Sequence, residues 1–385
     1  MNNTGSELQI SQNFDSGNIE VLQCNQAHDI QLAIKKDYNS GFYQWFHFRL
    51  TGARGQQCML KIINGGGAAY PAGFENYRVL YSYDRKEWRR HYTSLVNGVL
   101  SISFTPEFDS VYFAYFVPYS LERHQNFMSK SIKSPLCSLR ILGKTLDDRD
   151  LDLLTINDSL VTSNKKQCWI IARQHPGESM AEWWMEGAIQ SLLDKDNTIT
   201  TSILSNCTIH LVPNMNPDGS FRGHLRTNAA GRNLNREWAD ADINHCPEVF
   251  LVKKAMAETG VDFFLDVHGD ESLPYCFIAG TEGLSNWDEH QQQQLDFYRI
   301  ELAAVNSDFQ TKIGYPAKAL GQANLSMSTA QTAQLYKCLA MTLEMPFKDT
   351  IDTPDETYGW SVSRCKRLGE SCFEVMNSYV KKYLI

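Results

Sequence analysis

The sequence predicts an antiparallel β-sandwich domain followed by an α/β domain, whose mixed, mainly parallel sheet is covered by helices on both faces. Three observations support this fold class. A chain of 385 residues with 43% apolar residues is long enough to bury two cores. Residues 13–118 alternate short β-type runs with turn residues, which is typical of a sandwich. After residue 118, strand-like and helix-like segments alternate, which is typical of a mainly parallel sheet.

The first block, residues 1–118, is expected to form the N-terminal β-sandwich domain. Turn signals at Asn64-Gly65 and Asn97-Gly98 separate its strand-like runs, and no stretch shows convincing helical spacing. The runs cover residues 19–23, 30–34, 45–50, 58–63, 79–83, 99–104 and 111–117. The aromatic residues between Phe42 and Phe48 are interpreted as core and interdomain packing. We find no catalytic constellation in this block.

The second block, residues 119–385, begins with a helix over 120–131 capped by a serine and a hairpin over 139–156. Strands are predicted at 168–172, 207–212, 261–267, 275–279 and 339–345, and helices at 179–193, 246–259 and 287–309. We place the domain boundary near residue 118.

Composition excludes several classes of protein. The net charge of −8 and the lack of a long Lys/Arg run argue against a nucleic-acid-binding protein, which needs a basic face. No stretch reaches 18 uninterrupted apolar residues and the first eight residues do not resemble a leader, so we expect no membrane association and a cytoplasmic location. The ten cysteines are scattered without a Cys-x-x-Cys pair, which favours buried, reduced thiols.

A candidate metal site begins at His175 and Glu178, which follow the strand-like run 168–172 in a turn containing Pro176 and Gly177. An imidazole and a carboxylate three residues apart at the carboxyl end of a strand can bind one zinc ion. His-x-x-Glu also occurs at His245/Glu248 and His268/Glu271, so the pattern alone is weak. The alternative is that His175 and Glu178 only cap the following helix.

His268 is the candidate third ligand, because it ends the buried strand predicted at 261–267 and is followed by a glycine. Two histidines and one glutamate leave a fourth position open for water, as in catalytic rather than structural zinc sites. The alternative is a buried histidine with a purely structural role.

Two further segments contain polar residues that suit a reaction site. The polar segment 213–238 contains Arg226 and Arg236, whose guanidinium groups can bind a substrate carboxylate or stabilise an oxyanion. Arg222 and Arg232 are interpreted as ordinary surface residues. Glu344 is a lone carboxylate in the apolar strand 339–345, so it either forms a structural ion pair or faces a cleft as a general base.

Taken together, these residues resemble the M14 zinc carboxypeptidase family, and in particular its cytosolic carboxypeptidase subfamily. The motifs arrive in the order of the family: His175-Pro-Gly-Glu178, Pro213-Asn-Met-Asn-Pro-Asp-Gly219, Arg226 with Gly231-Arg-Asn-Leu-Asn235-Arg236, Asp266-Val-His268-Gly and Thr342-Leu-Glu344. The segments Phe14-Asp-Ser-Gly-Asn and Tyr43-Gln-Trp-Phe-His-Phe are similar to the β-sandwich that precedes the catalytic domain in the subfamily.

The resemblance implies one zinc ion per chain, held by His175, Glu178 and His268, and a reaction that hydrolyses the last residue from a peptide or protein. It further implies the following roles: Arg226 polarises the scissile carbonyl, Asn235 and Arg236 hold the terminal carboxylate, and Glu344 takes a proton from the attacking water and passes it to the leaving amine.

Two positions depart from the family pattern. Asn233 stands where the wider family commonly has an aspartate that orients a zinc-binding histidine, and an amide makes that histidine a weaker donor to the metal. Met341 replaces the subfamily's tyrosine before the catalytic glutamate. Tyr315 and Tyr336 are both considered for the family's substrate-capping tyrosine.

The sequence does not determine which last residue is preferred, and it leaves two other functions as alternatives. The subfamily removes glutamates, and Lys318 and Lys337 precede Glu344, which suggests an acidic residue although neither lysine matches a family position. A zinc amidohydrolase that acts on N-acyl amino acids, and a non-catalytic zinc-containing binding protein, are the alternatives. The intact Glu344 favours an enzyme.

Overall fold

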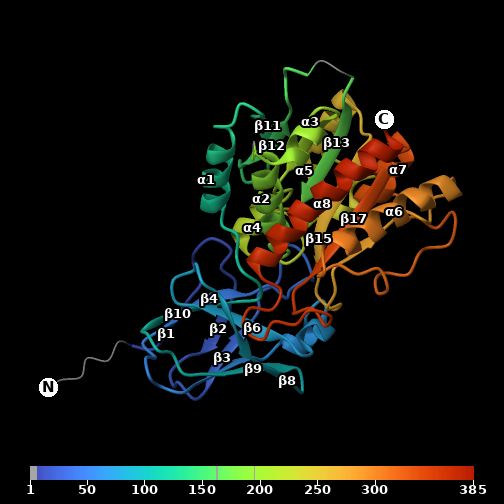
Figure 1. Cartoon of the computed structure of the whole chain (residues 1–385). Helices are drawn as coiled ribbons and strands as arrows, with labels where there is room; N and C mark the ends of the chain where they lie inside the picture. Colours follow the sequence, from blue (N-terminus) through green and yellow to red (C-terminus); the bar gives the residue numbers. More distant parts are fainter. Residues whose placement is uncertain (1–6, 162–163, 195) are drawn as a thin grey trace.

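The structure, a computed structural model, describes residues 7–161, 164–194 and 196–385. Residues 1–6, on which part of the leader prediction depends, lie outside the described residues. Two five-stranded sheets form the N-terminal part of the chain and a seven-stranded sheet forms the rest (Figure 1). This confirms the predicted fold class. The predicted division into residues 1–118 and 119–385 stays a prediction.

The two N-terminal sheets, which together with their loops up to residue 117 we call the N-terminal block, are almost entirely antiparallel. Their strands alternate buried apolar and more exposed side chains, as in β5, because one face of each sheet lies against the core. One sheet has the order β1 (Gln9–Ser11), β4 (His47–Thr51), β10 (Ser110–Ala114), β6 (Arg78–Ser82) and β7 (Arg89–Tyr92). The other has the order β2 (Glu20–Gln23), β3 (Ile30–Ala33), β5 (Cys58–Ile62), β9 (Val99–Phe104) and β8 (Ser94–Val96). The pair β3 and β5 is parallel, which the sequence prediction missed.

The seven-stranded sheet has four parallel strands at its centre and antiparallel strands at both edges. Its order is β11 (Cys137–Lys144), β12 (Asp150–Ile156), β14 (Cys207–Val212), β13 (Lys166–Ala172), β15 (Phe263–Asp270), β17 (Leu339–Pro346) and β16 (Phe277–Ala279). The run from β14 to β17 is parallel. The carboxyl ends of these parallel strands meet at one edge of the sheet, where side chains from distant segments come together.

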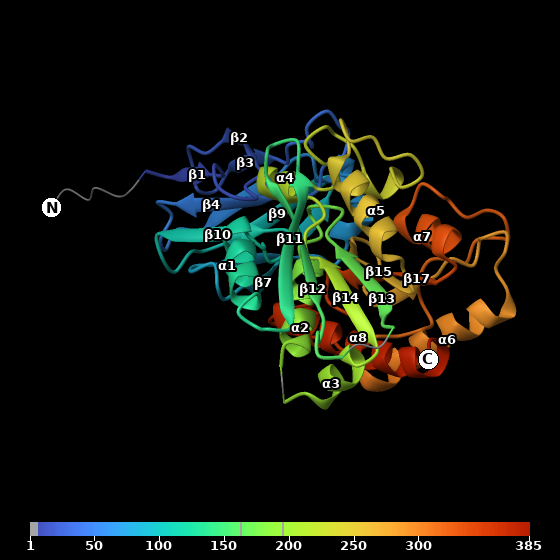
Figure 2. The same ribbon diagram turned by 90° about the horizontal axis from the view of Figure 1, so that it is seen from above.

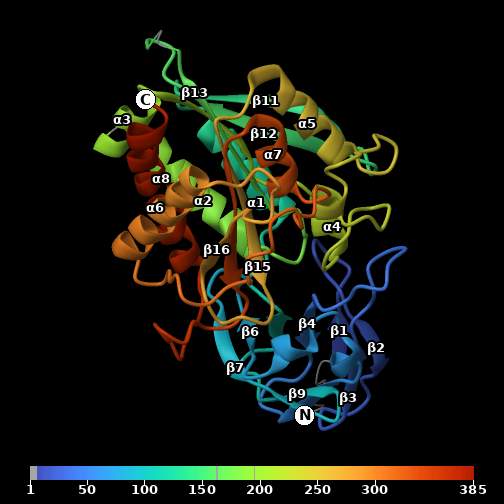
Figure 3. The ribbon, with the colours of Figure 1, turned by 90° about the vertical axis from the view of Figure 1, so that its right-hand side faces the viewer.

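Helices cover both faces of this sheet, as Figures 2 and 3 show. Strand β13 shows why, because Cys168 and Ile170 join one buried cluster while Trp169 and Ile171 join the other. The first face packs against α2 (Met180–Leu192), α3 (Thr198–Leu204), α6 (Glu289–Val305) and α8 (Val362–Tyr383). The second face packs against α5 (Pro247–Thr259) and α7 (Ser328–Tyr336). Both α1 (Leu121–Ser131), with its Ser120 cap, and the hairpin β11–β12 confirm the sequence prediction.

The N-terminal block and the seven-stranded sheet share one continuous apolar core. The Tyr115 ring stacks on Phe347 with 4.6 Å between the ring centroids. Ser179 and Trp183 of the α2 region both donate hydrogen bonds to the carbonyl of Val117. The whole N-terminal block therefore abuts the carboxyl edge of the larger sheet.

Two other sequence predictions have clear outcomes. All ten cysteines are free thiols and nine are buried, which confirms the predicted reduced state. Among the described residues, no helix is both long and apolar enough to cross a membrane.

Candidate metal centre and substrate cavity

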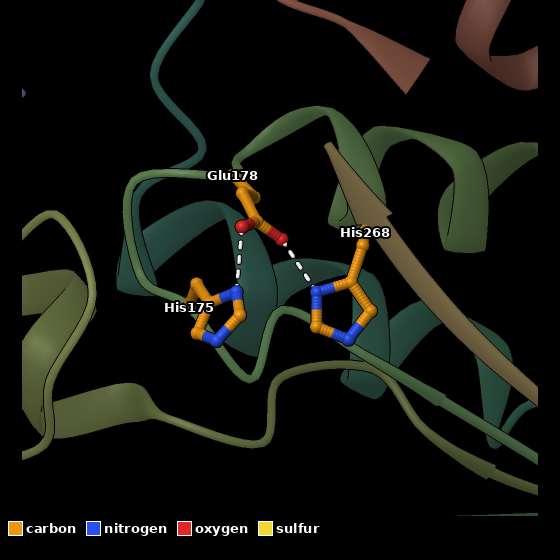
Figure 4. A group of neighbouring side chains, drawn as sticks. All are labelled: His175, Glu178 and His268. Carbon is orange, nitrogen blue, oxygen red and sulfur yellow. Dashed lines mark hydrogen bonds and ion pairs between the residues drawn. The ribbon is translucent and has the colours of Figure 1, made fainter. Parts of the chain in front are cut away.

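Three side chains from two neighbouring strand ends converge at the carboxyl edge of the large sheet (Figure 4). His175 and Glu178 lie in the turn between β13 and α2, and His268 lies near the end of β15. Strands β13 and β15 are parallel neighbours, with Ala172 paired to Val267, so both chains reach this edge side by side. The convergence is thus a consequence of the strand order.

The carboxylate of Glu178 lies between the two imidazoles. Its Oε1 is 2.6 Å from His175 Nδ1 and its Oε2 is 2.8 Å from His268 Nδ1. All three side chains are buried, and their ligand atoms lie within 4.8 Å of one another. Within the described part of the chain, no other trio of His, Cys, Asp or Glu side chains is close enough to bind one metal ion. His245 instead pairs with Asp242, away from this group.

The outer nitrogen of each imidazole is held by a different group. His175 Nε2 is 3.1 Å from Oδ1 of Asn233, and His268 Nε2 is 2.8 Å from Oδ2 of Asp266. Asp266 also accepts a hydrogen bond from Gln174 Nε2 at 2.6 Å. Such partners fix the ring orientation and leave the Nδ1 atoms directed at the centre. The sequence reasoning gave Asp266 no role, although its position two residues before His268 on one strand face could have indicated it.

The charges around this centre suit a divalent cation. Burial raises the pKa of Glu178, but the adjacent imidazoles of His175 and His268 outweigh burial and hold the pKa well below its ordinary value. Burial lowers the pKa of His268, but Asp266 and Glu178 on either side raise it well above its ordinary value. Burial and the Arg226 guanidinium lower the pKa of His175 to about 4, so its ring is a neutral donor at pH 7. Two imidazoles and one carboxylate are a donor set that fits a zinc ion with an open position, provided that the ion takes the place of the proton that the raised pKa keeps on His268.

Glu344 lies beside this centre because β17 is the next parallel strand. Its position pairs with His268 across the two strands, so both side chains leave the same face of the sheet. Oε2 of Glu344 is buried and has no hydrogen-bond partner among the described residues. Burial and the neighbouring carboxylates raise the pKa of Glu344 well above its ordinary value, although His268 opposes them. The structural alternative of a simple ion pair does not hold, because among the described residues Glu344 forms none.

A cavity of about 520 Å³ opens from the centre. Arg226, Asn235 and Arg236 line it together with the three candidate ligands and Glu344. Asn235 and Arg236 belong to the short 3-10 helix η3 (Leu234–Arg236), whose first turn is closed by the Asn233 side chain accepting from Asn235 N at 3.1 Å. Burial and the Arg226 guanidinium lower the pKa of Arg236, so the cavity holds two cationic groups at close range. This arrangement can bind an anion.

Of the two tyrosines considered for the substrate-capping role, only Tyr315 lines the cavity among the described residues. Tyr315 lines the cavity, and its hydroxyl oxygen is 2.5 Å from Oδ2 of Asp270 and 3.3 Å from Oε1 of Glu344. Tyr336 is not among the described residues that line the cavity, and it packs against the apolar cluster between the sheet and α5 and α7. Tyr315 is therefore positioned to contact a molecule in the cavity.

The cavity also contains residues that sequence reasoning missed. Tyr70 comes from the N-terminal block, and Arg299 and Glu282 form an ion pair at 3.2 Å in the cavity wall. Lys318 lines the cavity as well, whereas Lys337 is not among the described residues that do. Nothing in a single sequence indicated Tyr70, because it precedes the other site residues by a hundred positions and its approach depends on the packing of the two parts.

Two arginines of the same polar segment lie outside the cavity, as expected. Arg222 forms an ion pair with Asp147 at 2.6 Å, and Arg232 lies 3.9 Å from Glu237. Their interpretation as surface residues agrees with these contacts. The segment itself is more ordered than the predicted loop, because α4 (Pro217–Arg222) forms one end of it.

Comparisons with known families match both parts of the chain. Residues 10–116 match the cytosolic carboxypeptidase N-terminal domain, and residues 128–358 match the zinc carboxypeptidase family, M14. Cytosolic carboxypeptidase 6 of Caenorhabditis elegans is 27% identical over 95% of this chain and 86% of its own length.

Solved structures agree with this similarity. A metallo-carboxypeptidase from Burkholderia cenocepacia is 43% identical, with a TM-score of 0.96 over 98% of this chain and 100% of the other. A metallo-carboxypeptidase from Pseudomonas aeruginosa in complex with (2-guanidinoethylmercapto)succinic acid is 41% identical, with a TM-score of 0.94 over 97% of this chain and 99% of the other.

Proposed function

This chain belongs to the M14 zinc carboxypeptidase family and is a metallocarboxypeptidase, and we propose that it removes the last residue of peptides or proteins with one zinc ion held by His175, Glu178 and His268. One observation supports this most strongly. The three donors, the buried Glu344 carboxyl and the guanidinium groups of Arg226 and Arg236 all face a single cavity. No other part of the described chain combines these chemistries.

The roles of the protein side chains follow from their chemistry and position. Zinc, when bound, would act as a Lewis acid toward a carbonyl and lower the pKa of water toward neutrality. Glu344 would accept the proton of the attacking water, because a carboxyl with a raised pKa is a suitable base near neutral pH. It would then give that proton to the leaving amine. Arg226 would meet the negative charge that develops on the carbonyl oxygen.

The terminal carboxylate of the substrate would bind Asn235 and Arg236. A guanidinium can form two parallel hydrogen bonds with a carboxylate, and the amide of Asn235 adds a donor. Ser328 N donates to Asn235 Oδ1 at 2.9 Å, which orients the amide group so that its Nδ2 lies 3.5 Å from His268 Nε2, at the cavity. A substrate without a free carboxylate at its end would lose these contacts, which favours a carboxypeptidase over an endopeptidase.

Tyr315 is the residue we assign to the capping role. It lies in the segment between α6 and α7, and its hydroxyl is near both Asp270 and Glu344. Movement of this segment would bring a hydroxyl donor over a bound substrate. Tyr336 is set aside because it is not among the described residues that line the cavity.

We propose further that the preferred last residue is acidic. Arg299 and Lys318 line the cavity and are cationic, so they would attract a glutamate side chain. The competing preference, for a basic last residue, rests on the Glu282 carboxylate in the same wall and on the guanidino compound bound by the Pseudomonas aeruginosa relative. An acyl-amino-acid deacylase would use the same metal set, so hydrolysis of an N-acyl amino acid must be compared with that of peptides.

A cleavage assay tests both parts of the proposal. Purified, zinc-loaded protein is incubated with three peptides that differ only in a last residue of Glu, Lys or Leu, and with an N-acyl amino acid, and products are identified by mass spectrometry. We expect loss of one residue from the carboxyl end, fastest for Glu. Faster release of Lys would overturn the acidic preference, and hydrolysis of the N-acyl amino acid alone would overturn the carboxypeptidase assignment for this site.

A further inference from the structure

The segment that contains Arg226 is held by the N-terminal block, although Arg226 faces the cavity of the large sheet. Asp37, in the loop after β3, is 2% exposed and points its carboxylate at residues 225–227. Oδ1 accepts from Leu225 N at 2.7 Å. Oδ2 accepts from Arg226 N at 2.8 Å, from Thr227 N at 2.9 Å and from Thr227 Oγ1 at 3.1 Å. Charge-assisted bonds to three successive N–H groups fix the peptide planes on both sides of Arg226.

The guanidinium of Arg226 is also in contact with the N-terminal block. Its Cζ lies 5.5 Å from the centroid of the Phe42 ring and 5.6 Å from that of the Tyr70 ring. Both distances are within the range of a cation–π interaction. Among the described residues, Arg226 forms no ion pair that would hold its side chain elsewhere. Its orientation therefore depends on these two rings.

The surrounding segment docks closely on the same block. Gly231 has φ +82°, and a Cβ there would lie 2.7 Å from the carbonyl oxygens of Tyr38 and Asn39. Asn18 Nδ2 donates to the Gly223 carbonyl at 2.8 Å. The approach is so close that only glycine fits at position 231 without a shift of the backbone. The N-terminal block thus supports the segment on both sides of Arg226.

We propose that Asp37 is a positioning residue for the reaction, acting through Arg226, and that the N-terminal block is a structural part of the active site. This rests on the proposed function, in which Arg226 meets the charge on the carbonyl oxygen. Asp37 fixes the backbone of Arg226, and Phe42 and Tyr70 fix its guanidinium. The residues that would bind the substrate carboxylate have separate support, because Asn235 is held by Ser328. Loss of Asp37 should therefore slow the chemical step more than it weakens substrate binding.

A double-mutant cycle tests the proposal. We expect Asp37→Ala to lower kcat by about 100-fold, because misplacing a reacting group by about 1 Å has an effect of that size, while KM changes little. Arg226→Ala should lower kcat by about 100- to 1,000-fold. In the double variant, kcat should equal that of Arg226→Ala alone, because Asp37 then has nothing to position. The proposal would be overturned if the kcat losses of the two single variants multiplied in the double variant. It would also be overturned if Asp37→Ala had the kcat of the wild type.

Asp15 provides a matched control at the same junction. Its Oδ2 accepts from Leu121 N at 2.7 Å, so it also joins the N-terminal block to the rest of the chain through a backbone N–H. We expect Asp15→Ala to combine additively with Arg226→Ala and to keep kcat near that of the wild type. If Asp15→Ala showed the same non-additivity, Asp37 would act only as general support for the junction, and the proposal would be wrong.

Milder variants keep the test decisive if Asp37→Ala does not fold. Thr227→Val removes one of the four hydrogen bonds to Asp37, and Phe42→Leu removes one of the two rings near Arg226. Each should lower kcat severalfold without raising KM. If neither variant lowers kcat, the proposal is contradicted.

A structural measurement separates this inference from the proposed function. Crystal structures of the wild type and the most perturbing variant that folds should show the Arg226 guanidinium displaced from Phe42 and Tyr70 in the variant. An unmoved guanidinium would overturn the positioning role. If the wild type cleaved no peptide at all, the proposed function would fall, but the position of Arg226 in the variant would still decide whether Asp37 positions it.

Discussion

Glu344 is the residue whose replacement most directly tests the proposed chemistry. Glutamine keeps its shape but cannot accept a proton, so we expect Glu344→Gln to lower kcat by about 100- to 10,000-fold. Zinc content, measured by mass spectrometry of the metal, should remain one ion per chain, because Glu344 is not among the candidate ligands. Activity near that of the wild type would mean that another group moves the proton.

Glu248 offers a matched control for that substitution. It is also fully buried, and burial raises its pKa to about 8, although its contacts with Asn228 oppose the shift. It does not line the cavity among the described residues. We expect Glu248→Gln to keep kcat near the wild-type value. A large loss would show that buried carboxyl groups in this protein affect activity through the fold.

Asn233 is expected to influence how strongly His175 would bind a metal ion. Its Oδ1 contacts His175 Nε2, where the family pattern has an aspartate. A carboxylate would make the ring a stronger donor, so we expect Asn233→Asp to tighten zinc binding and Asn233→Ala to weaken it by about 10- to 100-fold. Competition with a coloured chelator measures both. Equal zinc affinity in all three proteins would show that the contact has no influence on the metal.

At the scale of elements, three of them meet at a buried ionic cluster. His124 of α1 lies 2.6 Å from Glu182 of α2 through Nδ1 and 3.0 Å from Asp152 of β12 through Nε2. Burial lowers the pKa of His124, but hydrogen bonds to the two carboxylates outweigh it and raise the pKa to about 9. The charged imidazole therefore stabilises the junction of these elements.

This cluster predicts a pH dependence of stability. The folded pKa of His124 is raised above the unfolded value of 6.5, so its contribution is complete below that pH and is lost as pH rises through about 9. The difference between the unfolded pKa of 6.5 and the folded pKa of about 9 corresponds to a contribution on the order of 3 kcal/mol to the free energy of unfolding, since one pKa unit is worth about 1.4 kcal/mol. Urea unfolding of the wild type and His124→Gln should show a stability difference that shrinks between about pH 6 and about pH 10. A constant difference would contradict the assignment.

The elements that sequence reasoning found are those with a strong local signal. Ser120 and the spacing after it predicted α1, and the apolar runs predicted the parallel strands that hold the site. Helix α8 was left unassigned although Leu368, Cys372, Val375 and Tyr379 follow helical spacing and are buried. Helix α7 is short, and strands β7 and β8 are too short and too exposed to give a clear alternation.

The site residues could be proposed from the sequence because each follows a strand end or a motif of the family. The sequence could not predict that these residues lie close together, because their proximity depends on the order of the strands in the sheet. His268 and Glu344 are neighbours only because β15 and β17 pair in register. Tyr70 and Asp37 could not be identified at all, because their contacts with the Arg226 segment arise from packing between two distant parts of the chain.

At the scale of the whole molecule, the shared core predicts cooperative unfolding. Apolar side chains from the N-terminal block and from the large sheet belong to one cluster, which includes the stacked pair Tyr115 and Phe347. We expect differential scanning calorimetry to show a single transition, with equal calorimetric and van't Hoff enthalpies. Two separate transitions would show that the two parts fold independently.

The central claim is that His175, Glu178 and His268 bind one zinc ion in the cavity that contains Glu344. The most direct test is an anomalous-scattering map of a crystal of the zinc-loaded protein, recorded at the zinc absorption edge. We predict one peak at about 2.0–2.2 Å from Nδ1 of each histidine and from a carboxylate oxygen of Glu178. A peak at another place in the molecule, or no peak at these three side chains in zinc-loaded protein, would contradict the account.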